Sequence, residues 1–171
     1  PYAPSLNQGV ATCITRQNGP SSLLVTLPNG KTAYEIPVAV HVLYPANAPQ
    51  YDVNNGTIIN FINYLNDAWQ ATYATYPQDG AGGNRIPVVF KLALRNQGCA
   101  ATSGINHVAV PALMDPDFTS DGVNVQTSAP WVGTTNFEPI QDLSRWPTTE
   151  YYNIYIVHKL DGKDGTSGQF I

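Results

Sequence analysis

Charged side chains are scarce in this chain of 171 residues. Asp, Glu, Lys and Arg make up 12% of it, about half of the roughly 25% that is usual in globular proteins. The eight Lys and Arg residues are scattered, and the formal net charge is −4. Binding to nucleic acid requires a basic surface that neutralises phosphates, so the sequence argues against a nucleic-acid partner. The neutral polar residues that replace the charges are common in secreted proteins, and we predict an extracellular location.

Long apolar stretches are also missing. No run reaches the ~18 residues that a membrane-spanning helix requires, so no membrane span is predicted. The first five residues have neither the basic start nor the apolar centre of a signal peptide. If the protein is exported, its signal has been removed or lies outside this sequence.

Cysteine is rare, with Cys13 and Cys99 as the two examples. In an oxidising compartment the simplest interpretation is one disulfide. This bridge would close a loop of about 86 residues, which the chain-entropy model values at ~4–5 kcal/mol. Two buried free thiols, or a thiolate that binds a metal ion, are the alternatives. We predict the disulfide.

Apolar residues are concentrated in three segments, at 36–44, 86–94 and 152–159, which we predict to be strands of one sheet. A length of 171 residues is enough for one domain with its own core. Between the first two strands, apolar residues recur at helical spacing and predict an amphipathic helix over about residues 56–72. The members of this apolar stripe are Ile58, Phe61, Ile62, Leu65 and Trp69. The predicted fold class is α+β, a twisted mixed β-sheet with a backing helix.

Residues 1–33 are predicted to form an N-terminal arm and a hairpin, because Pro28-Asn29-Gly30-Lys31 is a turn signal between two extended segments. The remainder, 34–171, forms the main subdomain. Within it, residues 96–150 are predicted to be irregular apart from a short strand at 104–110. A connection this long is usually functional or held down by other contacts.

The three histidines, His41, His107 and His158, lie on separate segments without metal-ligand spacing. Zinc sites in proteins use three or four ligands, and a shared site would need these segments to meet in the fold. We therefore interpret the histidines as structural. No catalytic residue and no metal ligand is assigned.

Three further motifs have a structural and a functional interpretation. Asp115-Pro116-Asp117 and Asp161-Gly162-Lys163-Asp164-Gly165 are acidic and are predicted to be solvated turns. The second is similar to half of a calcium loop but lacks the alternating ligands and the distal Glu, so calcium binding is the alternative. Asn55-Gly56-Thr57 fits the N-glycosylation acceptor, but a helix cap at this position is the simpler explanation.

Five segments carry a family resemblance. In chain order they are the strand from Ile36 to Tyr44, the helix from Ile62 to Trp69 with its Leu-Asn mark, the strand from Ile86 to Ala93, the step Gly104-Ile105-Asn106-His107-Val108, and Trp146-Pro147 followed by the strand from Tyr151 to Val157. In this order they resemble the N-terminal part of the catalytic domain of pappalysin-type (cytophagalysin-type) zinc metallopeptidases, which are metzincins. The resemblance runs from about residue 34 to the end of the chain.

The resemblance implies a metzincin-type fold, secretion, and zinc-dependent endopeptidase activity on a protein or peptide substrate. The family's His-Glu-x-x-His helix and methionine turn have no counterpart in this chain, and Met114 stands in a different context. No zinc ligand or catalytic Glu is therefore transferred to any residue. We predict the upper, N-terminal subdomain of a secreted zinc endopeptidase, which is inactive by itself because the remainder of its own polypeptide holds the zinc.

The resemblance also suggests roles for the two ends of the chain. Gly168, Gln169, Phe170 and Ile171 are predicted to pair with extended substrate through main-chain hydrogen bonds. Some relatives use a cysteine before the first strand to block the zinc, but Cys13 lacks the Cys-Gly signature and this role is an alternative. The alternative to the peptidase is a secreted, non-enzymatic binding or adhesion domain on the same scaffold.

Overall fold

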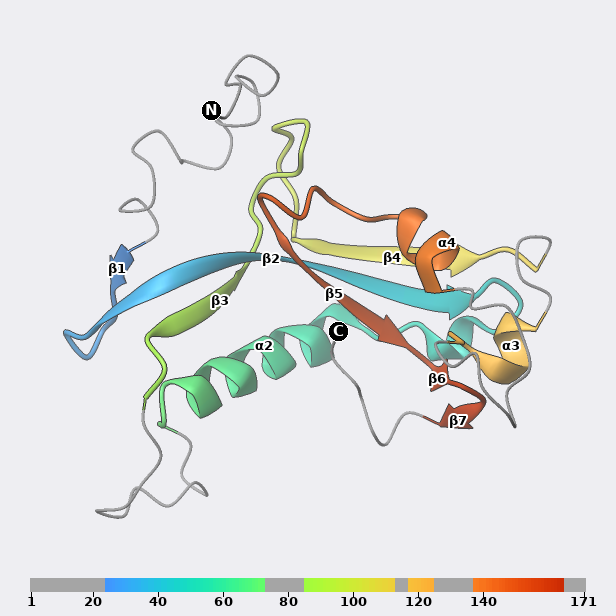
Figure 1. The fold of residues 1–171 in the computed structure, drawn as a ribbon, viewed down its shortest axis with the longest axis horizontal. Coiled ribbons are helices and arrows are strands. Elements are labelled where there is room, and N and C mark those ends of the chain that lie inside the picture. The colour runs from blue at the N-terminus through green and yellow to red at the C-terminus, as the bar shows by residue number, and fades with distance from the viewer. Residues whose placement is uncertain (1–23, 73–84, 113–116, 125–136, 165–171) are drawn as a thin grey trace. The chain divides into compact units, whose positions relative to one another are not determined.

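The computed structural model describes residues 24–72, 85–112, 117–124 and 137–164 (Figure 1). The chain divides into two compact units that both include part of the long strand β2 (Thr32–Pro45). The predicted boundary between residues 33 and 34 falls inside this strand. One unit comprises Pro1–Val38, Asn54–Gly104 and Pro147–Tyr152, and the other comprises Ala39–Val53, Ile105–Trp146 and Asn153–Ile171.

Strand β2 bonds to every other strand of the main sheet in the described part of the chain. The strand β1 (Leu24–Thr26) pairs with it in antiparallel orientation. Strands β3 (Val88–Leu92) and β4 (Ile105–Val110) pair with it in parallel orientation. Strand β5 (Tyr152–Val157) also pairs with β2. The three predicted strands thus belong to one mixed sheet, and the predicted α+β class is confirmed.

In the first unit, the predicted hairpin joins β1 to β2. Leu24 lies opposite Tyr34, and Thr26 lies opposite Thr32. Gly30 adopts a φ of 77°, which glycine reaches without steric cost, and its N–H donates to the Leu27 carbonyl oxygen at 2.9 Å. The turn residues in the sequence therefore form the predicted connection.

Helix α2 (Asn55–Trp69) covers β3 in the same unit. The Asn54 side chain caps the helix by accepting the Thr57 N–H at 3.0 Å, which satisfies one of the free donors of the first turn. The Trp69 ring meets the Phe90 ring edge-on, with the centroids 4.9 Å apart. The helix ends three residues before the predicted position because Ala71 has a φ of 54°, which is incompatible with a right-handed helix.

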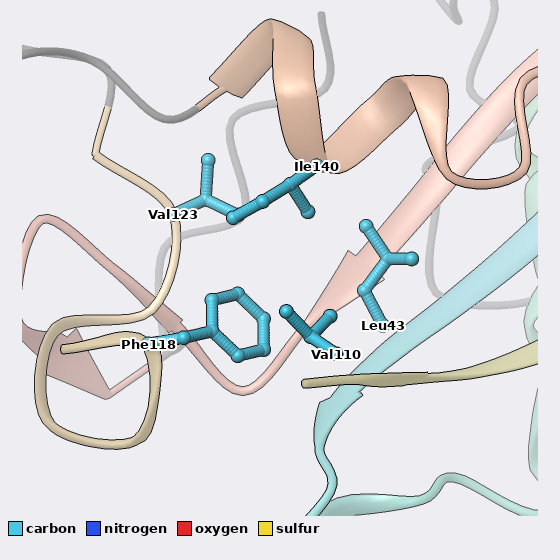
Figure 2. Close-up of a cluster of buried hydrophobic side chains, with 5 residues drawn as sticks. All are labelled: Leu43, Val110, Phe118, Val123 and Ile140. Carbon is cyan, nitrogen blue, oxygen red and sulfur yellow. The ribbon is translucent and has the colours of Figure 1, made fainter. Parts of the chain in front are cut away.

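In the second unit, β2 is fully buried from Ala39 to Leu43. Because successive side chains of a strand point to opposite faces, both faces of β2 are covered in this stretch. Figure 2 shows the apolar core of this unit, in which Leu43 of β2 and Val110 of β4 point toward three side chains from later segments. These three are Phe118, Val123 and Ile140.

Residues 96–150 contain more regular structure than predicted. The short strand at 104–110 is confirmed as β4, but two short helices, α3 (Phe118–Asp121) and α4 (Phe137–Asp142), were missed. Each helix contributes one buried side chain, Phe118 or Ile140. Helices of four and six residues are too short to show helical periodicity in a sequence.

Among its described residues, the second unit also contains a 3-10 helix and a small hairpin. The 3-10 helix η3 (Pro49–Tyr51) follows β2. Strands β6 (Lys159–Leu160) and β7 (Lys163–Asp164) form a hairpin closed by Asp161 and Gly162, which have φ values of 49° and 71°. Two positive φ values are the mark of a type I′ turn, for which Asp-Gly is a preferred pair.

Candidate functional site

A fully buried histidine, His41, lies at the centre of the polar residues of the second unit. It belongs to β2 and lies opposite Asn106 of β4 in the strand register. Its Nε2 is 2.8 Å from the Asn153 Oδ1 of β5, and its Nδ1 is 3.3 Å from the Asn106 Nδ2. Side chains from three strands thus form one hydrogen-bonded chain, Asn106–His41–Asn153.

The Asn153 side chain has a fixed orientation. Its Oδ1 accepts the Trp146 backbone N–H at 3.0 Å, and its Nδ2 donates to the Trp146 carbonyl oxygen at 3.0 Å. The oxygen that faces His41 is therefore an acceptor, and His41 donates its Nε2–H to it. At the other side of the ring, the Asn106 amide donates to Nδ1. The two amides thus select the neutral imidazole with its proton on Nε2.

Two aromatic rings enclose this imidazole. Tyr155 stacks on His41 with the centroids 4.8 Å apart and the planes inclined by 21°. Trp146 meets it edge-on at 6.4 Å. Burial lowers the pKa of His41, and the hydrogen bond to Asn153 opposes this effect to a smaller extent. Burial also raises the pKa of Tyr155, while the Arg145 guanidinium acts in the opposite direction. The cluster is therefore polar but uncharged at neutral pH.

The other two histidines have separate surroundings in the same unit. The His107 Nδ1 is 2.5 Å from the Asp52 Oδ1, and these side chains are 30% and 34% exposed. The His158 ring packs against Tyr51 and Phe118, with centroid distances of 4.7 Å and 5.1 Å, and its Nε2 donates to the Thr119 carbonyl oxygen. The fold does not bring the three histidines together.

A zinc site does not fit the described residues. Zinc requires ligand nitrogens with an available lone pair, but both ring nitrogens of His41 are bonded to amides. Within residues 24–72, 85–112, 117–124 and 137–164, no group of three His, Cys, Asp or Glu residues is arranged to hold a metal ion. No step of any reaction is therefore assigned to zinc on these residues.

Several residues singled out in the sequence lie outside the described residues: Cys13, the Asp115-Pro116 part of the first acidic turn, and the tail Gly168, Gln169, Phe170 and Ile171. Cys99 is described and lies in a tight turn with a φ of 67°. The Cys13–Cys99 bridge and the substrate-binding tail stay predictions.

The structure corrects two details of the motifs. Asp161 forms a turn, as predicted, but it is 4% exposed rather than solvated. Two backbone hydrogen bonds hold the turn against an earlier segment: the Asp161 N–H donates to the Val123 carbonyl oxygen, and the Gly162 N–H donates to the Asp121 carbonyl oxygen. At the start of α2, the cap is Asn54. Asn55, the residue of the glycosylation motif, occupies the first helical position and is exposed.

The sequence analysis missed the amide side chains that are buried or half-buried in the fold. On α2, Asn66 and Gln70 continue the column of Ile58 and Ile62 at four-residue spacing, and this position on the apolar stripe was a usable signal. The Gln70 Nε2 donates to the carbonyl oxygens of Ile86 and Val88. For Asn106 and Asn153 the sequence offers no comparable signal, because their partner His41 is 65 and 112 residues away.

Comparison of the chain with protein-family models and with curated proteins finds no match. In the part of the chain that the structure describes, no helix is both long and apolar enough to cross a bilayer. Chemically, the His41 cluster is a closed and neutral network. Both nitrogens of its imidazole bond to amides, so the cluster links side chains of three strands.

Proposed function

We propose that this chain is the upper, N-terminal subdomain of a secreted zinc-dependent endopeptidase of the pappalysin type. In this proposal the subdomain forms the wall above the substrate cleft. The zinc ligands and the catalytic Glu belong to another part of the same polypeptide. Zinc would polarise the scissile carbonyl and lower the pKa of a bound water. The residues of this chain would support the cleft rather than perform the chemistry.

One observation carries the proposal: residues that define the resemblance are residues on which the scaffold depends. Asn66, from the Leu-Asn mark of the helix, forms two hydrogen bonds with the Phe90 backbone of the second strand. Asn153, from the last segment, forms two with the Trp146 backbone. Because Asn66 and Asn153 hold backbone segments together, their presence in the family-like motifs supports a similar architecture rather than only a similar composition.

Gly104, from the fourth segment, supports the same argument. Its φ is 73°, and a Cβ atom at this position would lie 2.6 Å from the Ala93 nitrogen. Glycine is therefore required at this position, directly before β4. The resemblance thus includes a residue that the backbone geometry demands, in addition to side chains that hold the strands and the helix.

A specific observation favours the alternative, a secreted binding domain. In the first unit, Leu24 and Tyr34 lie directly opposite each other on β1 and β2 and are 48% and 50% exposed. Ile86, which lies next to the Pro87 carbonyl that accepts the Tyr34 N–H, is 46% exposed. Exposed apolar side chains on adjacent strands support a binding surface in this alternative.

The test starts from the residues encoded after Ile171. A His-Glu-x-x-His within a few tens of residues favours the peptidase, whereas a stop codon or a β-sandwich sequence favours the binding domain. The longer protein and the 171-residue chain are then incubated with zinc and a denatured protein substrate. We expect cleavage by the longer protein that a chelator abolishes and added zinc restores, and no cleavage by the short chain. A longer protein that carries an intact motif and is inactive would refute the peptidase proposal.

A further inference from the structure

With the side chains in their present orientation, the network around His41 offers no acceptor for a second proton. The Nε2–H of His41 already bonds to the Asn153 Oδ1, which also accepts the Trp146 N–H. The lone pair of Nδ1 faces the Asn106 amide nitrogen at 3.3 Å. A proton added to Nδ1 would make the His41 Nδ1–H and the Asn106 Nδ2–H two donors that face each other. The His41 ring has no exposed surface, so water cannot separate them.

We propose that His41 is an acid-sensitive lock on the second unit. When the imidazole takes up a proton from solvent at Nδ1, the Asn106–His41–Asn153 chain breaks, and the connection of β4, β2 and β5 in this unit opens. This inference is independent of the proposed function, because it rests on the contacts of one buried side chain. It adds a response to pH that a purely structural histidine would not have.

The groups that face His41 give no compensation for the added charge. From β4 it faces the Asn106 amide, and from β5 it faces Asn153 and the neutral phenol of Tyr155. The segment before β5 contributes the Trp146 ring. Among the described residues, the charges of Arg145 and Asp142 act on the Tyr155 hydroxyl, and neither contributes to the shift of the His41 pKa.

Two effects oppose the proposed opening, and both are smaller than the cost of burying the charge. The stacked Tyr155 ring attracts a cation, but a cation–π contact is weak beside the desolvation of an ion. Rotation of the Asn106 amide would turn its oxygen toward Nδ1 and remove the clash between donors. The imidazolium would still be enclosed by apolar and neutral groups, so the penalty for losing its hydration would persist.

The sign of the pH dependence follows from the direction of the shift. Burial lowers the pKa of His41 in the folded protein below its ordinary value of 6.5. The unfolded chain therefore binds this proton more readily than the folded protein does. The contribution of His41 is fully present above the unfolded pKa. It is lost progressively as the pH falls below 6.5 toward the lower pKa of the folded state.

The experiment compares the full chain with its Asn106→Asp variant. The thermal midpoint of each is measured by circular dichroism between about pH 7.5 and about pH 5, the range in which an unperturbed imidazole titrates. For the wild type we expect the midpoint to fall by about 3 °C or more as the pH decreases. The variant places a carboxylate of almost the same size beside Nδ1. We expect it to be less stable at about pH 7.5, with a midpoint that stays level or rises toward about pH 5.

Nitrogen NMR of the histidine rings identifies the tautomer and the titration of His41 directly. We expect a neutral ring with its proton on Nε2 that titrates below the ordinary range. His107→Gln and His158→Gln serve as matched controls, and both should keep the wild-type decrease in the thermal midpoint with falling pH. Equal pH slopes in the wild type and in Asn106→Asp would overturn the proposal. So would a proton on Nδ1 in the neutral ring, or a His41 that titrates at or above its ordinary pKa in the folded protein.

Discussion

Asn66 on α2 and Phe90 on β3 are joined by a pair of hydrogen bonds. The Asn66 Nδ2 donates to the Phe90 carbonyl oxygen at 2.8 Å, and the Phe90 N–H donates to the Asn66 Oδ1 at 2.7 Å. The side-chain amide of Asn66 therefore bonds both the N–H and the carbonyl oxygen of Phe90, as the backbone of a neighbouring strand would. In the other unit, Asn153 pairs in the same way with the Trp146 backbone. Each amide satisfies backbone groups that would otherwise be costly to bury.

Replacement of Asn66 by leucine should lower the free energy of unfolding by about 1–3 kcal/mol, because the Phe90 N–H and carbonyl oxygen would both lose a partner in a partly buried place. Urea unfolding of the full chain measures this change. The control is Asn63→Ala on the exposed side of the same helix, which should change stability by no more than about 0.5 kcal/mol. Equal effects of the two substitutions would show that the bonds to Phe90 contribute nothing.

Two glycines with almost the same backbone conformation allow strain and steric clash to be separated. Gly30 and Gly104 have φ values of 77° and 73°, but a Cβ at Gly30 would meet nothing within 4 Å. At Gly104 it would lie 2.6 Å and 2.9 Å from the Ala93 nitrogen and oxygen. Gly30→Ala should therefore cost about 1–2 kcal/mol from conformation alone. Gly104→Ala should cost clearly more, because backbone atoms must move.

Thermal unfolding of the two alanine variants, compared with the wild type, provides the measurement. If Gly104→Ala is no more destabilising than Gly30→Ala, the close approach of Gly104 to the Ala93 backbone is not tight in solution. The result would also weaken the use of Gly104 in the resemblance to the peptidase family.

The sequence predicted elements whose patterns are local. The apolar run of β2 and the stripe of α2 gave the correct element types, and Pro28-Asn29-Gly30-Lys31 gave the correct turn. The predicted end of α2 was wrong. The helix ends where Ala71 leaves the helical conformation, next to Gln70, whose side chain donates to the carbonyl oxygens of residues 86 and 88. Such contacts between distant residues leave no mark in a local window.

The candidate site was beyond prediction for the same reason. His41 was interpreted as a structural histidine, and the asparagines that bind it come from two later strands. Their pairing depends on the register of β4 and β5 against β2, which the local sequence pattern of each strand does not determine. Asp161 was likewise wrongly predicted to be solvated. Its burial depends on backbone hydrogen bonds of its turn to residues 121 and 123, which are distant in the sequence.

Phe118 should be the most sensitive position in the apolar core of the second unit. It is 1% exposed, and it packs with Leu43, Val110 and Ile140 (Figure 2). Phe118→Ala should lower the free energy of unfolding by about 3–5 kcal/mol, through lost burial and the cavity that remains. Leu143→Ala is the control, because Leu143 is 39% exposed. Urea unfolding that shows equally small losses for both variants would contradict the placement of α3 in this core.

The proposed Cys13–Cys99 disulfide would attach the N-terminal arm to a turn that is held by several hydrogen bonds. Arg95 and Ala101 form a β-bridge around this turn, and the Arg95 side chain donates to the Cys99 carbonyl oxygen at 2.9 Å. The Asn96 Oδ1 accepts the N–H groups of Gly98 and Ala100. A cysteine presented by such a turn loses little further freedom when it is bridged, which favours a stabilising disulfide.

Mass spectrometry of the chain purified from an oxidising compartment should therefore give a mass lower by two hydrogens than that of the reduced chain. The peptides that contain Cys13 and Cys99 should remain linked after proteolysis without reductant. Cys13→Ser should remove up to ~4–5 kcal/mol of stability under oxidising conditions, since the loop closed by the bridge spans about 86 residues. In the presence of reductant, the wild type and the variant should unfold at nearly the same urea concentration. Two thiols that react with an alkylating agent in the untreated, folded protein would rule out the bridge.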